Sequence, residues 1–254
     1  MVDVRGAFLR SLALRPPADG EPARSGHPWE LPAVRRLARE PLTLDPAVTF
    51  LVGENGSGKS TLIEALAGAL GMNAEGGSSN FSFATRPEDG SLADALRLAR
   101  GARRPRTDFF LRAESVFNAA SYLERLREEP GGATALDAYG GVSLHEQSHG
   151  ESFLSIVVHR FGRDGLYLLD EPEAALSVQN CLTLLRRIDE LVADGSQLVI
   201  ATHSPVLLAY PGATVYLLSE DGIERIDWEQ APPVALMRSF LNAPDAFLRH
   251  LRAD

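Results

Sequence analysis

The chain has 254 residues, of which 44% are hydrophobic and 23% are charged, so it is long enough for one large domain or two small ones. Both fractions are close to the average for soluble globular proteins and exclude disordered, collagen-like and coiled-coil chains. The net charge of −9 disfavours a protein that coats nucleic acid or an anionic membrane through its overall field, but it allows a local basic patch. Among the 25 basic residues, Lys59 is the only lysine.

A cytoplasmic protein is expected from the cysteine content and from the distribution of apolar residues. The single cysteine, Cys181, cannot form an internal disulfide, and its leucine-rich surroundings predict a buried structural residue. No apolar run in the sequence approaches the roughly 20 residues that a membrane-spanning helix needs. Charges at Asp3, Arg5 and Arg10 occupy the region where a signal peptide has its apolar core. We therefore expect a soluble protein without membrane insertion.

The spacing of apolar and turn residues predicts strands that alternate with helices along most of the chain. In chain order, the predicted elements are strand 8–14, strand 48–52, helix 60–70, helix 92–100, strand 109–111, helix 115–129, helix 150–161, strand 166–169, helix 174–193 and strand 197–201. A polar, glycine-rich stretch at 73–90 interrupts this pattern. A hairpin of strands 215–218 and 223–226, followed by two short helices, completes the prediction.

The apolar runs in the predicted strands are continuous rather than alternating with polar residues. Continuous runs are typical of a parallel sheet that helices bury on both faces. The fold class we expect is therefore α/β, with a mainly parallel sheet flanked by helices and with a few antiparallel strands.

A glycine-rich loop lies between the predicted strand 48–52 and the helix that follows it. Its residues match the pattern G-x-x-x-x-G-K-[ST] and are Gly53, Glu54, Asn55, Gly56, Ser57, Gly58, Lys59, Ser60 and Thr61. The glycines let backbone N–H groups point inward, and the helix N-terminus favours an anion, so we expect this P-loop to hold a polyphosphate. In that interpretation Lys59 reaches the β- and γ-phosphates, and the Ser60 hydroxyl binds Mg²⁺.

Two acidic residues, Asp170 and Glu171, follow the predicted strand 166–169. Ligands of open α/β sheets gather beyond the carboxyl ends of the strands, so these acids are expected to share one crevice with the P-loop. The pair suggests a division of roles, in which Asp170 orients the Mg²⁺ shell and Glu171 acts as general base toward a water molecule. The alternative is a solvated turn after a buried strand.

His203 follows the predicted strand 197–201 and is expected to reach the same crevice. A histidine there can hydrogen-bond a γ-phosphate or the attacking water. A capping role for the next helix is the alternative.

The ordered motifs resemble those of the ATPase domain of the ABC superfamily, and more closely those of its stand-alone AAA-family branch, related to RecF and SMC heads. Asp170 and Glu171 resemble the end of the Walker B motif, and His203 resembles the switch histidine. The segment 147–152 resembles the ABC signature and opens a helix, as it does in the family. The resemblance implies ATP and Mg²⁺ as cofactors and hydrolysis of ATP to ADP and phosphate.

In this family the signature of one subunit caps the γ-phosphate that the other subunit holds. The resemblance therefore implies a homodimer closed around ATP, in which Ser148, Gly150 and Glu151 of one copy face the nucleotide of the other. It also implies that the loop 175–177 couples the two sites and that closure drives an unidentified protein partner. A single ABC-type ATPase domain is implied for 1–254, with a helical insertion at about 72–147 and a C-terminal hairpin and helices at 212–254.

The sequence departs from the family pattern at two points. His149 stands in the signature where the family usually has glycine, and no glutamine lies between Lys59 and Gln147 to contact the metal and water. Glu114, which follows the predicted strand 109–111, is our candidate for that metal-contacting position, and a plain helix N-terminal acid is the alternative. Trp29 is a candidate for stacking on the adenine, or else a core residue.

The process that ATP drives is left open by the sequence. Six arginines lie between 97 and 112 and favour either a nucleic-acid backbone contact or a solvated loop: Arg97, Arg100, Arg103, Arg104, Arg106 and Arg112. The alternatives to a partner-driving ATPase are an ATP-gated DNA-binding module with slow hydrolysis and the ATPase subunit of a membrane transporter.

Overall fold

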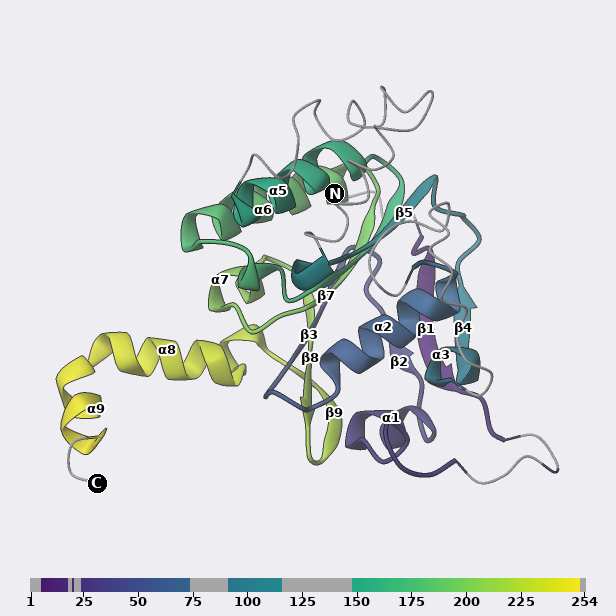
Figure 1. The fold of residues 1–254 in the computed structure, drawn as a ribbon, viewed down its shortest axis with the longest axis horizontal. Helices are drawn as coiled ribbons and strands as arrows, with labels where there is room; N and C mark the ends of the chain where they lie inside the picture. The colour runs from purple at the N-terminus through teal and green to yellow at the C-terminus, as the bar shows by residue number, and fades with distance from the viewer. Residues whose placement is uncertain (1–5, 18–19, 21–23, 74–90, 116–147, 252–254) are drawn as a thin grey trace.

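The computed structural model describes residues 6–17, 20, 24–73, 91–115 and 148–251, and two sheets form its centre (Figure 1). The larger sheet has six strands in the order β5-β6-β7-β3-β8-β9. The strand bounds are Val48–Gly53 for β3, Thr107–Arg112 for β5, Gly165–Asp170 for β6, Gln197–Ala201 for β7, Thr214–Ser219 for β8 and Gly222–Ile226 for β9. Neighbouring strands from β5 to β8 run parallel, and β9 pairs antiparallel with β8. The expected α/β class with a mainly parallel sheet is confirmed.

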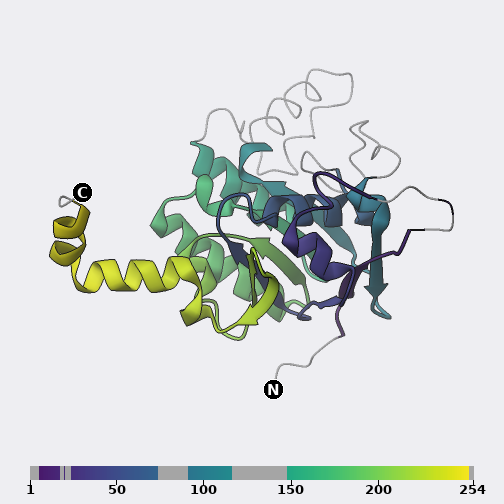
Figure 2. The same ribbon diagram turned by 90° about the horizontal axis from the view of Figure 1, so that it is seen from below.

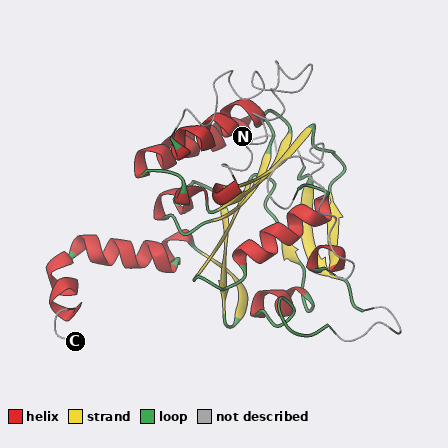
Figure 3. Cartoon of the chain, in the orientation of Figure 1, coloured by secondary structure: helices red, strands yellow, loops and turns green. Residues whose placement is uncertain are grey.

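Helices cover both faces of the larger sheet (Figure 3). The helices that pack on it are α1 (Pro32–Leu37), α2 (Lys59–Leu70), α5 (His149–Arg160), α6 (Val178–Ala193) and α7 (Pro205–Leu208). Alternate residues of β3 enter two different cores, since Phe50 and Val52 pack on the side of α5 and α6, whereas Leu51 packs on the side of α2. Burial on both faces explains why this strand reads as a continuous apolar run.

The smaller sheet is antiparallel and has the order β2-β1-β4. Its strands are β1 (Leu9–Leu14), β2 (Leu42–Thr43) and β4 (Leu96–Arg100). The fully buried side chain of Gln197, at the start of β7, joins the two sheets. Its Nε2 donates to the backbone oxygens of Leu9 at 2.8 Å and Asp45 at 2.7 Å, and its Oε1 accepts from the Leu9 N–H at 2.9 Å. One side chain thus satisfies main-chain groups that burial would otherwise leave unpaired.

The predicted helix 92–100 is wrong. The segment forms a single short helix, α3 (Leu92–Ala95), and then continues as strand β4. In β4, Leu96 and Leu98 lie opposite Leu14 and Leu12 of β1. Pairing with a strand more than 80 residues away overrides a local helical pattern, and this pairing cannot be read from the segment itself.

Two further predicted helices need comment. The helix expected at 174–193 begins at Val178, because a 3₁₀ turn over Pro172–Ala174 precedes it and Ser177 caps its N-terminus by accepting from the N–H of Asn180. The helix expected at 115–129 lies outside the described residues except for residue 115. The described part of the range 72–147 contributes the short helix α3 and strands β4 and β5, so a helical insertion there stays a prediction.

The C-terminal part begins with the expected hairpin, β8 and β9. After it, α8 (Pro232–Asn242) and α9 (Pro244–Leu251) extend away from the body of the molecule (Figure 2). These two helices expose apolar side chains at Leu236, Met237, Phe240, Leu241 and Leu248. No helix in the described part of the chain is long and apolar enough to cross a membrane.

Candidate functional site

The P-loop connects β3 to α2 at the carboxyl edge of the larger sheet. Gly58 caps α2 with a left-handed backbone (φ 94°), and Gly56 is also left-handed (φ 81°). A Cβ at Gly53 would lie 2.3 Å from the backbone oxygen of Leu218 in β8 and 2.7 Å from the Ser57 Oγ. Only glycine fits at that position, so β8 and the loop pack against each other without a side chain between them. The buried Ser57 Oγ has no hydrogen-bond partner among the described residues.

Lys59 is the first residue of α2, and its side chain is 3% exposed. Its Nζ donates to the backbone oxygens of Gly53 at 2.9 Å and Glu54 at 3.0 Å. Burial lowers the pKa of Lys59, while the nearby carboxylates of Glu171 and Asp170 act in the opposite direction. The ammonium is therefore held inside the loop in a partly desolvated place, where a polyphosphate is the ligand that would compensate its charge best.

Asp170 ends β6 and is 1% exposed. Its Oδ1 accepts from the Ser60 Oγ at 3.1 Å, and its Oδ2 lies 3.5 Å from the Arg112 Nε. Burial raises the pKa of Asp170 to about 6, although the Ser60 hydroxyl and the Arg112 guanidinium both act to lower it.

A hydroxyl and a carboxylate side by side suit Mg²⁺, which usually takes few protein ligands and completes its shell with water and phosphate oxygens. Ser60 and Asp170 thus fit the predicted metal position.

Arg112 was counted in the sequence only as one of a run of arginines, but it lies at this site. It ends β5 directly opposite Asp170 in the parallel register. Its Nη1 lies 2.5 Å from the Glu64 Oε1 of α2, and its Nη2 lies 3.4 Å from the Glu114 Oε2. Adjacent parallel strands end at the same level of a sheet, so the residues that follow their apolar runs lie side by side. This rule could have placed Arg112 beside Asp170.

Glu114 lies in a 3₁₀ turn over Ala113–Ser115, and its side chain is 80% exposed. Its carboxylate pairs with Arg112, which lies between it and Asp170. A contact from Glu114 to the metal stays a prediction.

Glu171 and His203 come together from the ends of two adjacent strands, β6 and β7. Glu171 has a left-handed backbone (φ 47°), and its Oε1 lies 3.4 Å from the Nε2 of His203. That nitrogen is buried and has no hydrogen-bond partner among the described residues. The backbone N–H of His203 donates to the carboxylate of Glu173. Glu171 and His203 lie close together, as expected. The sequence did not indicate that Glu173 also lies at this place.

The signature segment opens α5, with its first residue, Gln147, outside the described residues. Ser148 caps the helix: its Oγ lies 2.7 Å from the Glu151 Oε2, and its N–H donates to the same oxygen at 2.9 Å. These hydrogen bonds lower the pKa of Glu151. A Cβ at Gly150 would lie 3.0 Å from the Ala175 oxygen, so the helix start packs on the loop 175–177. Ser148, His149 and Glu151 are exposed and able to meet a partner.

Trp29 packs against the core on the side of α2, with the Arg24 guanidinium 4.9 Å from the centre of its ring. This is the core role considered for it above, and stacking on adenine stays a prediction.

A P-loop between a central parallel strand and a helix, with an acidic pair on a strand of the same sheet, defines the class of the P-loop nucleoside triphosphatases. A family model described as "AAA domain" matches residues 33–129, and a model described as "AAA domain, putative AbiEii toxin, Type IV TA system" matches residues 111–209.

Curated relatives are ATP-binding proteins of the ABC type. The cytochrome c biogenesis ATP-binding export protein CcmA of Rhodopseudomonas palustris is 30% identical over 170 residues, which cover 61% of this chain and 78% of that protein. The ribose import ATP-binding protein RbsA 2 of Burkholderia pseudomallei is 32% identical over 197 residues, which cover 68% of this chain and 37% of that protein. The chain belongs to the ABC superfamily of ATPases, a membership that supports ATP binding and hydrolysis.

The fold agrees with that membership. A chain of a metal-chelate-type ABC transporter in an inward-facing conformation superposes with a TM-score of 0.51 at 16% sequence identity, and the alignment covers 87% of this chain and 84% of that one. This chain spans only about a third of the length of several relatives, 37% for two ribose import proteins and 32% for a plant ABC transporter of the G family.

Proposed function

We propose that this protein is a Mg²⁺-dependent ATPase that converts ATP and water to ADP and phosphate, and that two copies close around two ATP molecules. The observation that carries the proposal is the meeting of three groups at one sheet edge: the buried Lys59 ammonium, the hydrogen-bonded pair of Ser60 and Asp170, and Glu171 beside His203. Their residues lie at or follow the ends of three different strands, β3, β6 and β7, so the tertiary fold is needed to bring them together.

In this proposal the P-loop holds the phosphates through its backbone N–H groups and through Lys59. Ser60 and Asp170 hold Mg²⁺, which supplies charge neutralisation on the β- and γ-phosphates when it is bound. Arg112 and its partners keep the Asp170 carboxylate oriented toward Ser60.

Glu171 is proposed as the general base. Its side chain is 39% exposed, so a water molecule can approach it, and its backbone is left-handed directly after β6. His203 is close enough to Glu171 to orient the same water or to donate a hydrogen bond to the γ-phosphate.

The proposed dimer uses the N-terminus of α5, where Ser148 and the amide of Gly150 face the nucleotide of the partner copy. Support comes from the packing of Gly150 on the loop 175–177, which continues from Glu171. A movement of the signature segment in one copy can therefore be transmitted to Glu171 of the same copy through this short, packed segment.

Replacing Glu171 by Gln tests the enzymatic proposal, since glutamine keeps the shape and removes the base. Turnover measured as phosphate release should fall on the order of 100-fold, while ATP binding persists and the protein elutes as a dimer in ATP. The matched control is Glu220→Gln on the exposed turn between β8 and β9, which should leave all three measurements unchanged. Undiminished phosphate release from the Glu171→Gln protein would show that the proposed catalytic role is wrong.

A second candidate, the ATPase subunit of a membrane transporter, is favoured by the export and import functions that the relatives' names state. The Glu171→Gln protein trapped in ATP serves as bait, with ADP as the reference state. Recovery of a membrane protein in ATP alone supports this candidate. Recovery of soluble protein or nucleic acid alone favours the stand-alone branch.

A further inference from the structure

The carboxylate of Glu173 occupies an unusual place between the two strand ends that carry Glu171 and His203. After Ala201 the backbone of β7 leaves the sheet, and the N–H of Thr202 makes the last bond to a neighbouring strand, 3.0 Å from the Leu51 oxygen. The next N–H, that of His203, has no strand to donate to and donates instead to the Glu173 Oε1. A side chain therefore replaces the missing strand partner.

The same turn carries both the acid and this side chain. Glu173 lies in the 3₁₀ turn over Pro172–Ala174, two residues after Glu171. One hydrogen bond thus ties the backbone of His203 to the turn that presents Glu171, and the imidazole Nε2 lies 3.4 Å from the Glu171 Oε1. Displacement of the His203 backbone would change this separation directly.

Stability alone does not explain a carboxylate here. The second oxygen of Glu173, Oε2, is buried and has no hydrogen-bond partner among the described residues. A buried acceptor without a partner lowers the stability of a fold. What the carboxylate does provide is a charge-assisted hydrogen bond to the N–H, which is shorter and stronger than a neutral one.

We propose that Glu173 is a positioning residue, which holds the backbone of His203 so that the imidazole stays in place beside Glu171 for the reaction at the γ-phosphate. The inference rests on the proposed function, because it assigns Glu173 an effect on turnover through His203. The effect of Glu173 on the His203 backbone can also be measured without turnover.

Kinetics of three variants separate hydrogen bonding from bulk structure. Glu173→Ala removes the acceptor and should lower kcat about tenfold or more, because small misplacements of catalytic groups are costly, while the KM for ATP changes little since the P-loop is untouched. Glu173→Gln keeps an oxygen acceptor and should recover kcat to within about threefold of the unsubstituted protein. Glu220→Ala, on the exposed β8–β9 turn, is the control.

A second measurement does not depend on ATP hydrolysis. Amide hydrogen exchange at His203, measured in the full chain without nucleotide, should be faster in Glu173→Ala and unchanged in Glu173→Gln and Glu220→Ala. If Glu173→Ala does not fold, Glu173→Asp replaces it, since it retains the charge and shortens the reach, and it should show the same faster exchange.

Unaltered His203 exchange in the Ala or Asp variant overturns the proposal, as does a loss of kcat in Glu173→Gln that equals the loss in Glu173→Ala while His203 exchange in Glu173→Gln stays unchanged, which would assign the effect to the charge of Glu173 rather than to the position of His203. Absence of ATP hydrolysis in the unsubstituted protein refutes the proposed function instead, and the exchange data still decide whether Glu173 positions His203.

Discussion

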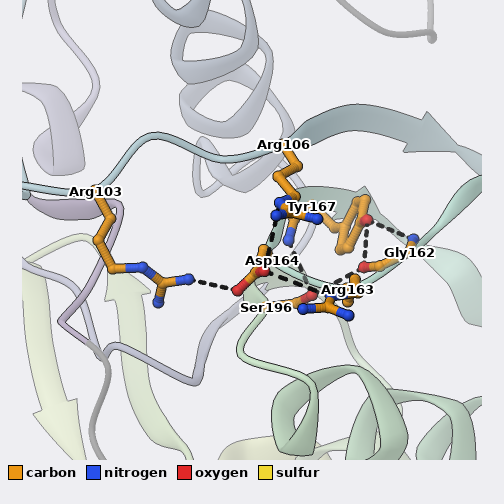
Figure 4. Close-up of polar contacts among 8 residues, drawn as sticks. Arg103, Arg106, Gly162, Arg163, Asp164, Tyr167 and Ser196 are labelled. Atoms are coloured by element: carbon orange, nitrogen blue, oxygen red, sulfur yellow. Dashed lines mark hydrogen bonds and ion pairs between the residues drawn. The ribbon is translucent and has the colours of Figure 1, made fainter.

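A non-glycine residue with a left-handed backbone lies at each end of strand β6, and the two residues have different roles. Asp164 precedes the strand and Glu171 follows it, and they are the only non-glycine residues with positive φ in the described part of the chain, at 54° and 47°. The carboxylate of Asp164 accepts from Arg103 and lies 3.7 Å from nitrogens of both Arg106 and Arg163 (Figure 4). The carboxylate of Glu171 has His203 at 3.4 Å and is 39% exposed.

Other polar groups at the amino edge, on Ser196, Tyr167 and Gly162, are also paired. The Ser196 Oγ accepts from the Gly165 N–H and donates to the Gly162 oxygen, both at 3.0 Å, and the Tyr167 hydroxyl bonds to both main-chain groups of Gly162 (Figure 4). At the carboxyl edge, by contrast, Ser57, Glu173 and His203 each leave a buried polar atom without a hydrogen-bond partner among the described residues. The Nη1 of Arg103 at the amino edge is also buried without a hydrogen-bond partner among the described residues. The contrast therefore concerns the main-chain and hydroxyl groups of Gly162, Ser196 and Tyr167, which are paired, and the groups at the edge that we propose binds a ligand, which leave atoms unpaired.

The comparison also divides the run of arginines between 97 and 112. Arg112 belongs to the carboxyl edge, and Arg103 and Arg106 serve Asp164 at the amino edge. Within the described residues, three of the six therefore pair with carboxylates, and the surface left for nucleic acid is smaller than the sequence suggests.

The largest expected effect comes from Lys59. Substitution by Ala should lower phosphate release on the order of 100-fold or more, and Lys59→Arg should do nearly the same because a planar guanidinium does not fit where a compact ammonium does. Thermal stability should not fall, since burial already disfavours the charge. Arg104→Ala, an exposed control, should leave turnover unchanged. If the Lys59 variants unfold, the carboxyl edge also stabilises the fold, and the difference between the two edges of the sheet is lost.

Substitution of Gln197 should have the opposite outcome to substitution of Lys59, because it should lower stability and leave activity unchanged. Gln197→Leu leaves the N–H and oxygen of Leu9 and the oxygen of Asp45 unpaired in a buried place, and should lower the free energy of unfolding by about 3 kcal/mol. Urea denaturation measures this loss, with Gln179→Leu on the exposed face of α6 as the control. Turnover per folded molecule should be unchanged, and a selective loss of kcat would place Gln197 in the functional site.

Asp170 predicts a pH dependence in the absence of metal. Its folded pKa of about 6 lies above the ordinary value of 3.8, so between about pH 4 and 6 the folded state binds more protons than the unfolded state and stability falls as the pH rises. The non-titrating Asp170→Asn variant should therefore gain stability relative to the unsubstituted protein across this window, by at most about 3 kcal/mol above pH 6. Thermal melting in EDTA measures the difference, and a difference that does not change with pH would contradict the assignment.

Substitution of Asp164 should have the smallest effect on stability, and the pH dependence of this effect should have the opposite sign to that of Asp170. Hydrogen bonding from Arg103 and the nearby Arg163 and Arg106 hold the pKa of Asp164 below its ordinary value against the effect of desolvation, so its contribution is present above the ordinary pKa and is lost as the pH falls through the lower folded pKa. Asp164→Asn, which tolerates the left-handed backbone, should lower Tm at neutral pH less than Gln197→Leu does. The deficit should shrink in acid and in high salt, and turnover should not change.

Five residues of the carboxyl edge could be predicted from the sequence because each belongs to a local pattern. Lys59 and Ser60 lie in a contiguous motif, and Asp170, Glu171 and His203 each follow an apolar strand. Parallel strands end at a common edge, so the pattern alone brings these side chains near one another.

The amino edge and the second sheet could not be predicted in the same way. The bonds of Gln197 to Leu9 span 188 residues, and β4 becomes a strand only because it pairs with β1. Glu173 was missed for a similar reason, since its partner is a backbone N–H on another strand end and carries no sequence signal.

The close approach of Gly53 to the Leu218 oxygen has a consequence for synthesis of the chain. Strand β3, which leads into the P-loop, lies between β7 and β8, and these two neighbours are translated about 150 and 165 residues after it. A nascent chain that carries the whole P-loop therefore still lacks the walls that shape it. We expect a ribosome-bound chain to acquire affinity for nucleotide only after Ser219 has left the exit tunnel.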